Sequence, residues 1–357
     1  MTEPPGGLAL YVHWPYCARI CPYCDFNVVR ARGRETEMSG LVAALLDDLA
    51  AQATLVGPRP LVSIFFGGGT PSLMPPEAVA AVVDRARALF PATGDIEVTL
   101  EANPTDAEAE RFAALAAAGV TRLSLGVQSL DDAALKFLGR NHSGAEARHF
   151  DRLSLDLIYA RPGQTISDWR AELIWALESG FEHISPYQLT IEPGTAFGRA
   201  VARGAWAPPD EDLAADLYEA TQSVLGQAGF EAYEVSNHAR GVVAWSVHNL
   251  HVWRGGDYLG LGPGAHGRLT LDGVRTATLA HRGVADYVAG VGANTPWAEQ
   301  TALSPVEAAE EKVLLGLRTV EGVSLAVLAD LHLGPGEGPL ASLIEDGFLT
   351  LSEGRVA

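Results

Sequence analysis

The chain of 357 residues contains only three cysteines, and all of them lie within residues 17–24. Three closely spaced thiols cannot build the disulfide framework of a small secreted domain. The opening residues, MTEPPGGLALYVHW, lack the basic and long apolar regions of a secretory signal. We find no apolar run that approaches the roughly 20 residues of a membrane-spanning helix. These absences favour a cytoplasmic protein that keeps its thiols reduced for metal or redox chemistry.

Basic residues are also scarce. The 25 Lys and Arg residues face 44 Asp and Glu residues, which gives a formal net charge of -19. A charge of that sign repels phosphate backbones, so nucleic acid is not expected as a partner. Hydrophobic residues make up 48% of the chain and charged residues 19%, as in a globular protein with a buried core. The length suits one large domain with a smaller one attached.

Short apolar runs alternate with helical patterns up to about residue 190. The expected strands cover residues 8–13, 61–66, 95–102, 121–127, 152–159 and 183–190. Apolar residues at three-and-four spacing predict intervening helices over residues 37–54, 76–90, 105–118, 131–138 and 167–179. This alternation predicts parallel βαβ units, in a doubly wound sheet or a partial (β/α) barrel. A full barrel needs eight units and about 250 residues, so these units fall short of it.

The connection GRNHSGAEARHF, residues 139–150, does not fit this alternation. Ser143 and Glu146 have the spacing of a helix capping box, but the next strand begins a few residues later. Parallel strands normally need a crossover of a dozen or more residues. Part of a helix is therefore expected to be absent here.

The pattern changes beyond residue 190. A linker leads to an expected helix near residues 210–228 and to a strand in EAYEVSNHA. The following residues are rich in Gly, His and Trp and predict an ordered connecting region. Ser304 then caps a helix with Pro305 in its first turn, the first of three helices that end in a short hairpin. That order predicts a small winged-helix-like domain. The expected domains are residues 1–240, 241–303 and 304–357.

Distinctive residues lie at the carboxyl ends of the expected strands. The cysteines follow the first strand and GGGTP, residues 67–71, follows the second. Glu101 closes the third strand and Gln128 the fourth, whereas Asp156 lies within the fifth. Active sites of parallel α/β folds gather at this edge of the sheet. The sequence therefore predicts one site there.

The spacing C-x3-C-x2-C offers three thiolate ligands from one loop: Cys17, Cys21 and Cys24. Such ligands suit zinc or an iron–sulfur cluster. Structural zinc takes four protein ligands, and the nearest histidine, His13, lies inside the first strand. Three thiolates on a cubane cluster would leave one iron open for a small ligand. From the spacing alone, a zinc site or a redox-active thiol loop remains an alternative.

The glycine turn GGGTP lets a backbone approach a ligand closely, because glycine has no side chain to clash. Beside the cysteines it can bind the amino and carboxylate groups of an amino-acid-like ligand. Glu101, Gln128 and Asp156 could hold hydroxyl or ammonium groups, and Arg140 could pair with a carboxylate. Taken singly, each of these residues could equally be a barrel polar group, a helix cap or a surface arginine.

Taken together, the motifs resemble the radical S-adenosylmethionine (SAM) superfamily, in its oxygen-independent coproporphyrinogen III oxidase-like branch. The resemblance rests on YVHWPYCARICPYCDF, FFGGGTPSL, LEANP, LSLGVQS, LGRNH and SLDLIYARPGQT. It extends from about residue 8 to about residue 350 and implies a partial (β/α)6 TIM-like barrel with a small C-terminal helical domain. It also implies a [4Fe-4S] cluster, with SAM on the open iron and an electron from the cluster cleaving SAM to a radical.

The same resemblance assigns residues to each group. The cluster ligands would be Cys17, Cys21 and Cys24. The SAM site would consist of Tyr11, Gly68, Gly69, Thr70, Glu101, Gln128, Arg140 and Asp156.

Two features separate the members of this branch. The oxidases usually carry another cysteine two residues after the third cluster ligand, where this chain has Phe26. The heme chaperones carry an H-N-x-x-Y-W motif linked to heme binding. HNLHVW, residues 248–253, matches that motif except for Val252 in place of tyrosine. The chain therefore resembles the heme chaperones more than the oxidases.

His248 is the candidate heme ligand, because a neutral imidazole is a normal axial ligand of heme iron. His251 and His266 are the alternatives, and Trp245 and Trp253 could cover a porphyrin face. From the residues alone, a hydrogen-bonded structural histidine and core tryptophans explain this segment equally well.

The resemblance favours a heme chaperone that binds heme and passes it to an unidentified acceptor protein. The cluster and SAM would then form a regulatory or redox site that is supplied by an electron donor. The alternative is an enzyme that decarboxylates coproporphyrinogen III, and a third reading is a zinc or redox-thiol protein without SAM. Weak association with a membrane surface, without a span, is also expected.

Overall fold

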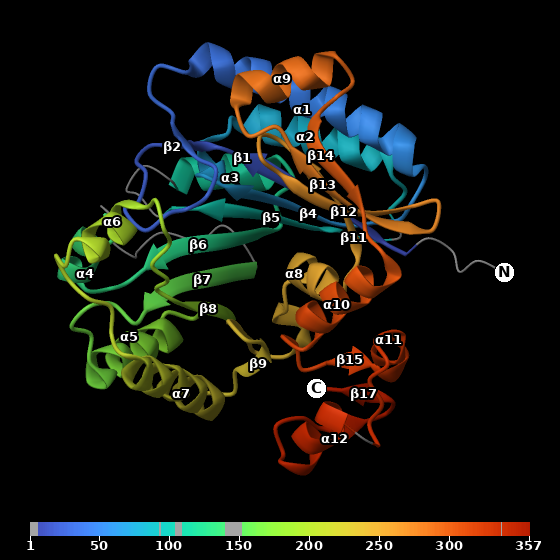
Figure 1. The fold of residues 1–357 in the computed structure, drawn as a ribbon. Helices are drawn as coiled ribbons and strands as arrows, with labels where there is room; N and C mark the ends of the chain where they lie inside the picture. The colour runs from blue at the N-terminus through green and yellow to red at the C-terminus, as the bar shows by residue number, and fades with distance from the viewer. Residues whose placement is uncertain (1–5, 93, 104–108, 140–151, 337) are drawn as a thin grey trace.

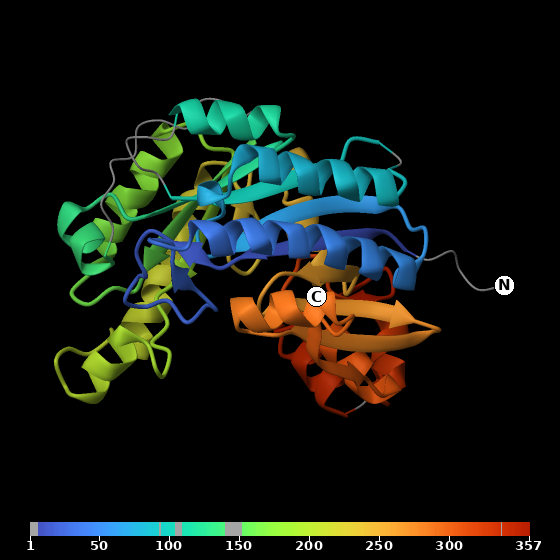
Figure 2. The same cartoon turned by 90° about the horizontal axis from the view of Figure 1, so that it is seen from above.

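The computed structural model describes residues 6–92, 94–103, 109–139, 152–336 and 338–357. One large twisted sheet runs through the molecule with helices along its outside, and the C-terminal segment forms a small group of helices beneath α8 (Val247–Trp253) and β9 (Glu231–Glu234) (Figure 1). The view from above shows the same arrangement (Figure 2).

The centre of the sheet is parallel. Its neighbouring strands are β1 (Leu8–Trp14), β4 (Leu61–Gly68), β5 (Glu97–Ala102), β6 (Arg122–Gln128), β7 (Arg152–Tyr159) and β8 (His183–Gln188). The helices between them are α1 (Glu35–Val56), α2 (Pro76–Leu89), α3 (Ala109–Ala117), α4 (Asp132–Phe137) and α5 (Ile166–Glu178). The predicted partial (β/α)6 unit is confirmed. The short connection predicted over residues 139–150 lies outside the described residues from residue 140 onward.

Further strands extend the sheet at both ends. Beside β1, the order continues through β11 (Asp257–Leu261), β12 (His266–Leu271), β13 (Val274–Ala280) and β14 (Trp297–Ala302). Beside β8, it continues through β10 (Asn237–Ala239) and β9 (Glu231–Glu234). β11 is parallel to β1, whereas β10 is antiparallel to β8. Because β11 and β10 occupy these two edges, the parallel strands do not close into a ring.

Two sequence expectations differ from the structure in this region. EAYEVSNHA forms a hairpin of β9 and β10 rather than one strand, because Val235 and Ser236 turn the chain back. Residues 241–303 were expected to connect two domains, but their strands join the main sheet. They also supply a short 3-10 turn (Val242–Ala244), α8 (Val247–Trp253) and α9 (Val284–Gly292). Domain boundaries at residues 240 and 303 stay a prediction.

The burial of the central strands explains why they could be predicted from the sequence as short apolar runs. β1 is buried at every position except Tyr11, as expected for a parallel strand covered on both faces. Leu41, Leu45 and Leu49 of α1 lie in the same continuous core. α9 packs beside α1, and Tyr287 donates a hydrogen bond of 2.6 Å to the buried Asp48 (Figures 1 and 2).

By length and composition alone, α1 could cross a membrane, with a mean hydropathy of 1.3 over its most apolar window. The expectation that no segment reaches such a length is wrong by this measure. The signal is weak, because core helices of globular proteins pass the same test. Here the helix buries Asp48 and Gln52 together with its leucines against the sheet.

The C-terminal segment has its own small core. Its elements are α10 (Pro305–Gly316), β15 (Val323–Ser324), α11 (Leu325–Asp330), α12 (Gly338–Glu345), β16 (Leu351–Ser352) and β17 (Arg355–Val356). Ser304 and Glu307 form the capping box that starts α10. Val323, Leu328, Leu340 and Val356 make a separate hydrophobic cluster. This arrangement agrees with the expected helical, winged-helix-like unit. α6 (Ala196–Ala202) and α7 (Glu211–Gln227) complete the fold.

Candidate functional site

The cysteine loop is held at both ends by a short ladder of β2 (Tyr16–Cys17) and β3 (Val29–Arg30). The backbone N–H of Ala31 donates to the carbonyl of Cys17 at 2.9 Å, and that of Cys24 donates to Cys21 at 3.2 Å. Cys17 is buried, whereas Cys21 and Cys24 are partly exposed. All three line one cavity of about 420 Å³, which we call the cysteine cavity.

The glycine turn packs directly on the strand that leads to the cysteines. The N–H of Gly69 donates to the carbonyl of Trp14 at 2.7 Å, and that of Thr70 donates to Tyr16 at 2.9 Å. A Cβ on Gly69 would lie 2.8 Å from three backbone atoms of residues 14–16. Gly68 has a φ of +108°, which favours glycine. The turn is therefore a close-fitting cradle that no larger residue can form.

Two carboxylates project from β5 and β7 into the cysteine cavity. Glu101 accepts the N–H of Gly68 at 3.2 Å, and Ser124 donates to Asp156 at 2.9 Å. Burial, with the nearby Asp156 charge, raises the pKa of Glu101 to about 8. Burial also raises the pKa of Asp156 to about 6. At neutral pH the pair therefore carries a proton that an incoming cationic ligand would displace.

Gln128 ends β6 in an unusual conformation. Its φ is +70°, and the register between β6 and β7 shifts at this point. Such a backbone is costly for a residue with a side chain and persists where the surrounding structure enforces it. The result is that Gln128 lines the cysteine cavity from the end of its strand.

The structure brings most of the predicted cluster and SAM residues to this one cavity. Its walls include Cys17, Cys21, Cys24, Gly68, Gly69, Thr70, Glu101, Gln128 and Asp156. Tyr11 lies instead in an adjoining cavity, and Arg140 lies outside the described residues. In the part of the chain that the structure describes, no three His, Cys, Asp or Glu side chains are placed to hold a single metal ion. Three thiols beside a glycine cradle fit a [4Fe-4S] cluster with an amino-acid-like ligand.

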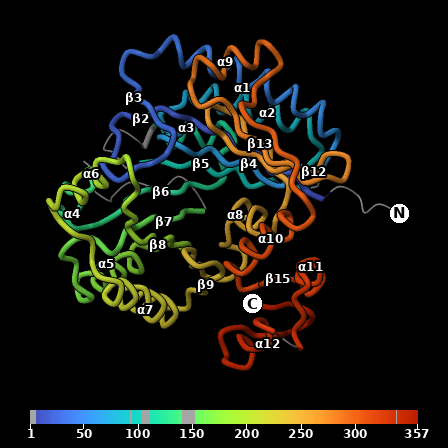
Figure 3. Tube along the Cα trace, viewed as in Figure 1, coloured from blue at the N-terminus to red at the C-terminus, as the bar shows by residue number. Residues whose placement is uncertain are grey.

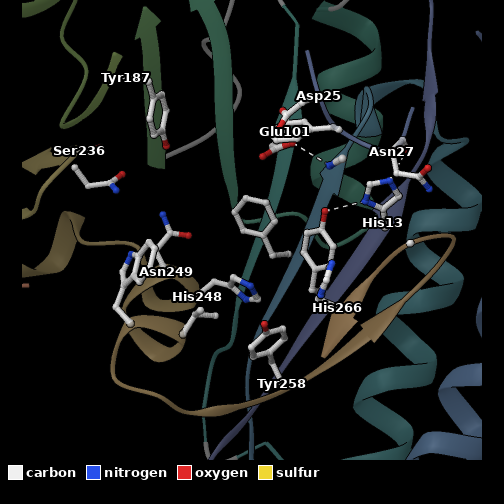
Figure 4. A pocket seen from close by; sticks show the side chains of 18 of the residues that line it. His13, Asp25, Asn27, Glu101, Tyr187, Ser236, His248, Asn249, Tyr258 and His266 are labelled. Atoms are coloured by element: carbon white, nitrogen blue, oxygen red, sulfur yellow. Dashed lines mark hydrogen bonds between the residues drawn. The ribbon is translucent and has the colours of Figure 1, made fainter. Parts of the chain in front are cut away.

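The adjoining cavity has a volume of about 750 Å³, and we call it the histidine cavity (Figure 4). It shares walls with the cysteine cavity. The shared residues are Asp25, Phe26, Phe65, Gly68, Glu101, Tyr187 and Asn249. Phe26, the residue that stands in place of the oxidase cysteine, is 63% exposed between the two.

His248 projects from α8 into the histidine cavity. Its Nδ1 forms a 3.0 Å hydrogen bond with Ser63, and its ring lies 4.9 Å from that of Phe65. The first turn of α8 is fixed by Glu97, which accepts the N–H of His248 at 3.0 Å. Burial lowers the pKa of His248 to about 3, so the imidazole is neutral. In the tautomer whose Nδ1–H donates to Ser63, Nε2 carries the lone pair that could coordinate a metal.

Of the other residues expected to contact heme, some line the histidine cavity and others do not. Trp253 and His266 line the histidine cavity, as does Val252. His251 points elsewhere, because its Nε2 bonds the carbonyl of Asp257 at 2.8 Å. Trp245 stacks on Tyr233 at 4.9 Å and is not among the residues lining that cavity.

A set of hydrogen bonds beside the cysteine loop, which we call the clamp, was not expected from the sequence. Tyr11 donates to Nδ1 of His13 at 3.0 Å, and Nε2 of His13 donates to the carbonyl of Asn27 at 2.9 Å. The Asn27 side chain donates to the carbonyls of Pro263 and Arg282 at 2.8 and 2.9 Å. The cysteine loop is thereby tied to segments more than 200 residues away. In the sequence, only the position of Asn27 just after the cysteine loop could have indicated this role.

A buried polar chain inside the barrel was also missed. Ser154 bonds Nδ1 of His183 at 2.7 Å, and Nε2 of His183 bonds Tyr233 at 2.7 Å. Tyr233 in turn accepts the N–H of Ser246, the residue that caps α8. The polar alternation of Ser154 and Asp156 within an apolar strand could have indicated a polar barrel interior.

Comparisons with known proteins agree with this geometry. The profile of the radical SAM superfamily matches residues 11–173. The mitochondrial radical S-adenosyl methionine domain-containing protein 1 of Bos taurus is 43% identical over 90% of this chain and 76% of its own length. Heme chaperone HemW of Mycobacterium tuberculosis is 37% identical over 97% of this chain and 89% of its length.

A solved structure extends the agreement to the fold. That of coproporphyrinogen III oxidase (HemN) from Escherichia coli, described as a radical SAM enzyme, superposes with a TM-score of 0.81. The superposition covers 99% of this chain and 87% of that chain. At 22% sequence identity, this likeness shows a shared fold and nothing about function.

Family membership implies SAM and a [4Fe-4S] cluster, and the cysteine cavity supplies residues that fit both. The chain belongs to the radical SAM superfamily, in the group that contains the HemW heme chaperones and radical S-adenosyl methionine domain-containing protein 1.

Proposed function

We propose that this protein is a heme chaperone that binds heme in the histidine cavity, with His248 as the axial ligand. The observation that carries the proposal is a neutral, oriented imidazole in the wall of a cavity of about 750 Å³. That volume lies within the range of roughly 300–1,000 Å³ typical of small-molecule sites. Relatives named as heme chaperones over most of this chain's length support the same assignment.

The surroundings of His248 suit a metal ligand. A histidine that binds a metal usually has its second nitrogen engaged by a hydrogen bond, which fixes the ring and its tautomer. Ser63 fills that position at Nδ1. Phe65 and Trp253 offer aromatic surface in the same cavity. Heme would then leave for an acceptor protein, with the protein located in the cytoplasm or weakly associated with a membrane.

The cysteine cavity takes a supporting role in this proposal. Cys17, Cys21 and Cys24 would hold the [4Fe-4S] cluster, which supplies one-electron chemistry to SAM when an electron donor reduces it. The cradle at Gly68 and Gly69 would hold the amino-acid end of SAM. The shared walls would let this site regulate the adjoining heme site.

The alternative is oxidative decarboxylation of coproporphyrinogen III, and a porphyrinogen would occupy the same histidine cavity. Phe26 stands against it, because the oxidases of this branch usually have a cysteine at that position. Turnover of coproporphyrinogen III with SAM and a reductant would favour the enzyme.

Heme titration of the wild type, His248→Ala and Val247→Ala tests the proposal. Val247 is exposed on the same helix, so its variant controls for damage to α8. We expect a Soret shift and tight binding for the wild type and Val247→Ala, and a loss of about tenfold or more for His248→Ala. Failure of the wild type to bind heme, or equal binding by His248→Ala, would overturn the assignment.

Metal analysis tests the cluster separately. Anaerobic reconstitution with iron and sulfide should give about four irons per chain with matching labile sulfide. One zinc per chain without labile sulfide would instead support the zinc or thiol protein.

A further inference from the structure

Heme carries two propionate carboxylates, and this chain has a formal net charge of -19. A strongly acidic protein repels an anionic ligand unless cationic groups lie at the site itself. Asp25 adds to that repulsion in the wall of the histidine cavity, whereas burial raises the pKa of Glu101 to about 8 and Glu234 is paired with Arg318. A heme site there therefore needs a cation within reach of a propionate.

Two arginines line the histidine cavity, Arg282 and Arg318. Arg318 is already engaged: it pairs with the buried carboxylate of Glu234 and lies 4.5 Å above the ring of Trp253. Its charge offsets that of Glu234 and is not free for a ligand. Arg282 differs, because it is exposed and forms no ion pair with any residue that the structure describes.

The backbone of Arg282 is nevertheless fixed. Asn27 donates to its carbonyl at 2.9 Å and also to that of Pro263 at 2.8 Å. His13 donates in turn to the carbonyl of Asn27, so the clamp reaches back to β1. An arginine with an anchored backbone and a free guanidinium loses less freedom when it binds a carboxylate.

His266 lies beside this arginine. It begins β12 opposite Leu279 of β13, and Arg282 follows the end of β13 by two residues. Arg282 is also close enough that its charge helps to lower the pKa of His266, after burial and Arg268. In Figure 4, Asn27 and His266 lie on one side of His248, and Ser236 and Tyr187 lie on the other. The cation is therefore placed on the β12 side of the cavity.

We propose that Arg282 binds a propionate carboxylate of the heme, with His266 next to it as a second polar contact. The inference rests on the proposed heme function and adds to it the recognition of the carboxylate edge of the cargo. The planar guanidinium can donate two parallel N–H···O bonds to one carboxylate, which gives orientation as well as affinity. Heme would be held at its iron by His248 and at its edge by Arg282.

The test compares heme with heme dimethyl ester, which has the same iron and ring but no free carboxylates. Both are titrated in the same mild detergent against the wild type, Arg282→Gln and Arg87→Gln. Arg87 is an exposed arginine of α2 and does not line either cavity. We expect Arg282→Gln to weaken heme binding about five- to tenfold and to leave binding of the ester unchanged. Arg87→Gln should bind both as the wild type does.

The outcomes separate this inference from the proposed function. Equal heme affinity for the wild type and Arg282→Gln, or an equal loss for heme and ester, would overturn the role of Arg282 and leave the heme site standing. A wild type that binds neither compound would overturn both.

Discussion

The two carboxylates of the cysteine cavity show how the barrel interior shifts the chemistry of single residues. Glu101 and Asp156 share the cavity, and burial opposes the charge of each. For Glu101 the hydrogen bond from Gly68 works against burial but does not balance it. A buried acid of this kind favours the folded state most when it is protonated.

The stability of the ligand-free protein should therefore fall with rising pH. The pKa of Glu101 is raised from 4.5 to about 8, so its contribution is fully present below pH 4.5 and is lost as the pH rises through about 8. We expect the urea midpoint to decline over this range in the wild type and to decline less in Glu101→Gln. Glu77→Gln, at an exposed position on α2, is the control. Identical pH profiles for wild type and Glu101→Gln would contradict this view.

Ser63 should matter to heme binding without touching the heme. Its hydroxyl holds Nδ1 of His248 at 3.0 Å, and loss of such a contact typically weakens metal binding 10–100-fold. We expect Ser63→Ala to weaken heme binding about tenfold, as measured by absorbance titration. Ser39→Ala, on the exposed side of α1, should bind heme normally. Unchanged affinity in Ser63→Ala would mean that the ring is oriented by other contacts.

At the scale of elements, the glycine turn after β4 depends on the strand beside it. Gly69→Ala would place a Cβ 2.8 Å from backbone atoms, and overpacking of this kind costs about 1–3 kcal/mol. We expect a lower urea midpoint and a loss of SAM binding by calorimetry. Gly40→Ala is the matched substitution, because Gly40 lies within α1 with no atom near its Cβ position. It should instead stabilise the protein by about 0.5–1 kcal/mol.

If Gly69→Ala were more stable than Gly40→Ala, the glycine turn would be able to move away from β1 and accept a side chain. If Gly69→Ala still binds SAM, the glycine turn can accept a side chain without losing its ligand.

The sequence was informative where elements are buried on both faces. β1, β4 and β7 read as short apolar runs because helices cover one side and the barrel interior the other. The edge strand β14 carries no such pattern. It has the sequence WAEQTA and is largely exposed, so neither its apolar content nor its period marks it as a strand.

The same difference applies to the site. Motif residues such as Cys17 and Gly69 could be predicted because they follow successive parallel strands, whose carboxyl ends must meet. The histidine cavity could not be assembled in this way. Asn27, His248 and Arg282 come from separate parts of the chain and meet only because β11 pairs with β1. Figure 3 shows the late segment of β12 and β13, in orange, which belongs to the same sheet as β4 and β5 from the early part of the chain.

At the scale of the whole molecule, two cavities that share walls should influence each other. Glu101 and Phe65 face both, and the ligand of one cavity will alter the charge or packing of the other. We expect saturating SAM to change heme affinity of the reconstituted protein by about fivefold or more. Binding linkage is reciprocal, so heme must change SAM affinity by the same factor. Calorimetric titrations in both orders measure the two factors.

Heme affinity that is the same with and without SAM would show that the shared walls are rigid and transmit nothing. Cys21→Ser protein without a cluster is the control, because SAM should lose its main anchor there and with it any effect on heme.

The open form of the barrel bears on how a large flat ligand could enter and leave the histidine cavity. β11 and β10 cap the edges of β1 and β8, and residues of all four strands line the histidine cavity. Under the proposed heme function, a flat macrocycle would lie with its edge between the β1–β11 side and the β8–β10 side of this cavity. An acceptor protein would then have to contact the molecule at these four strands to take the ring over.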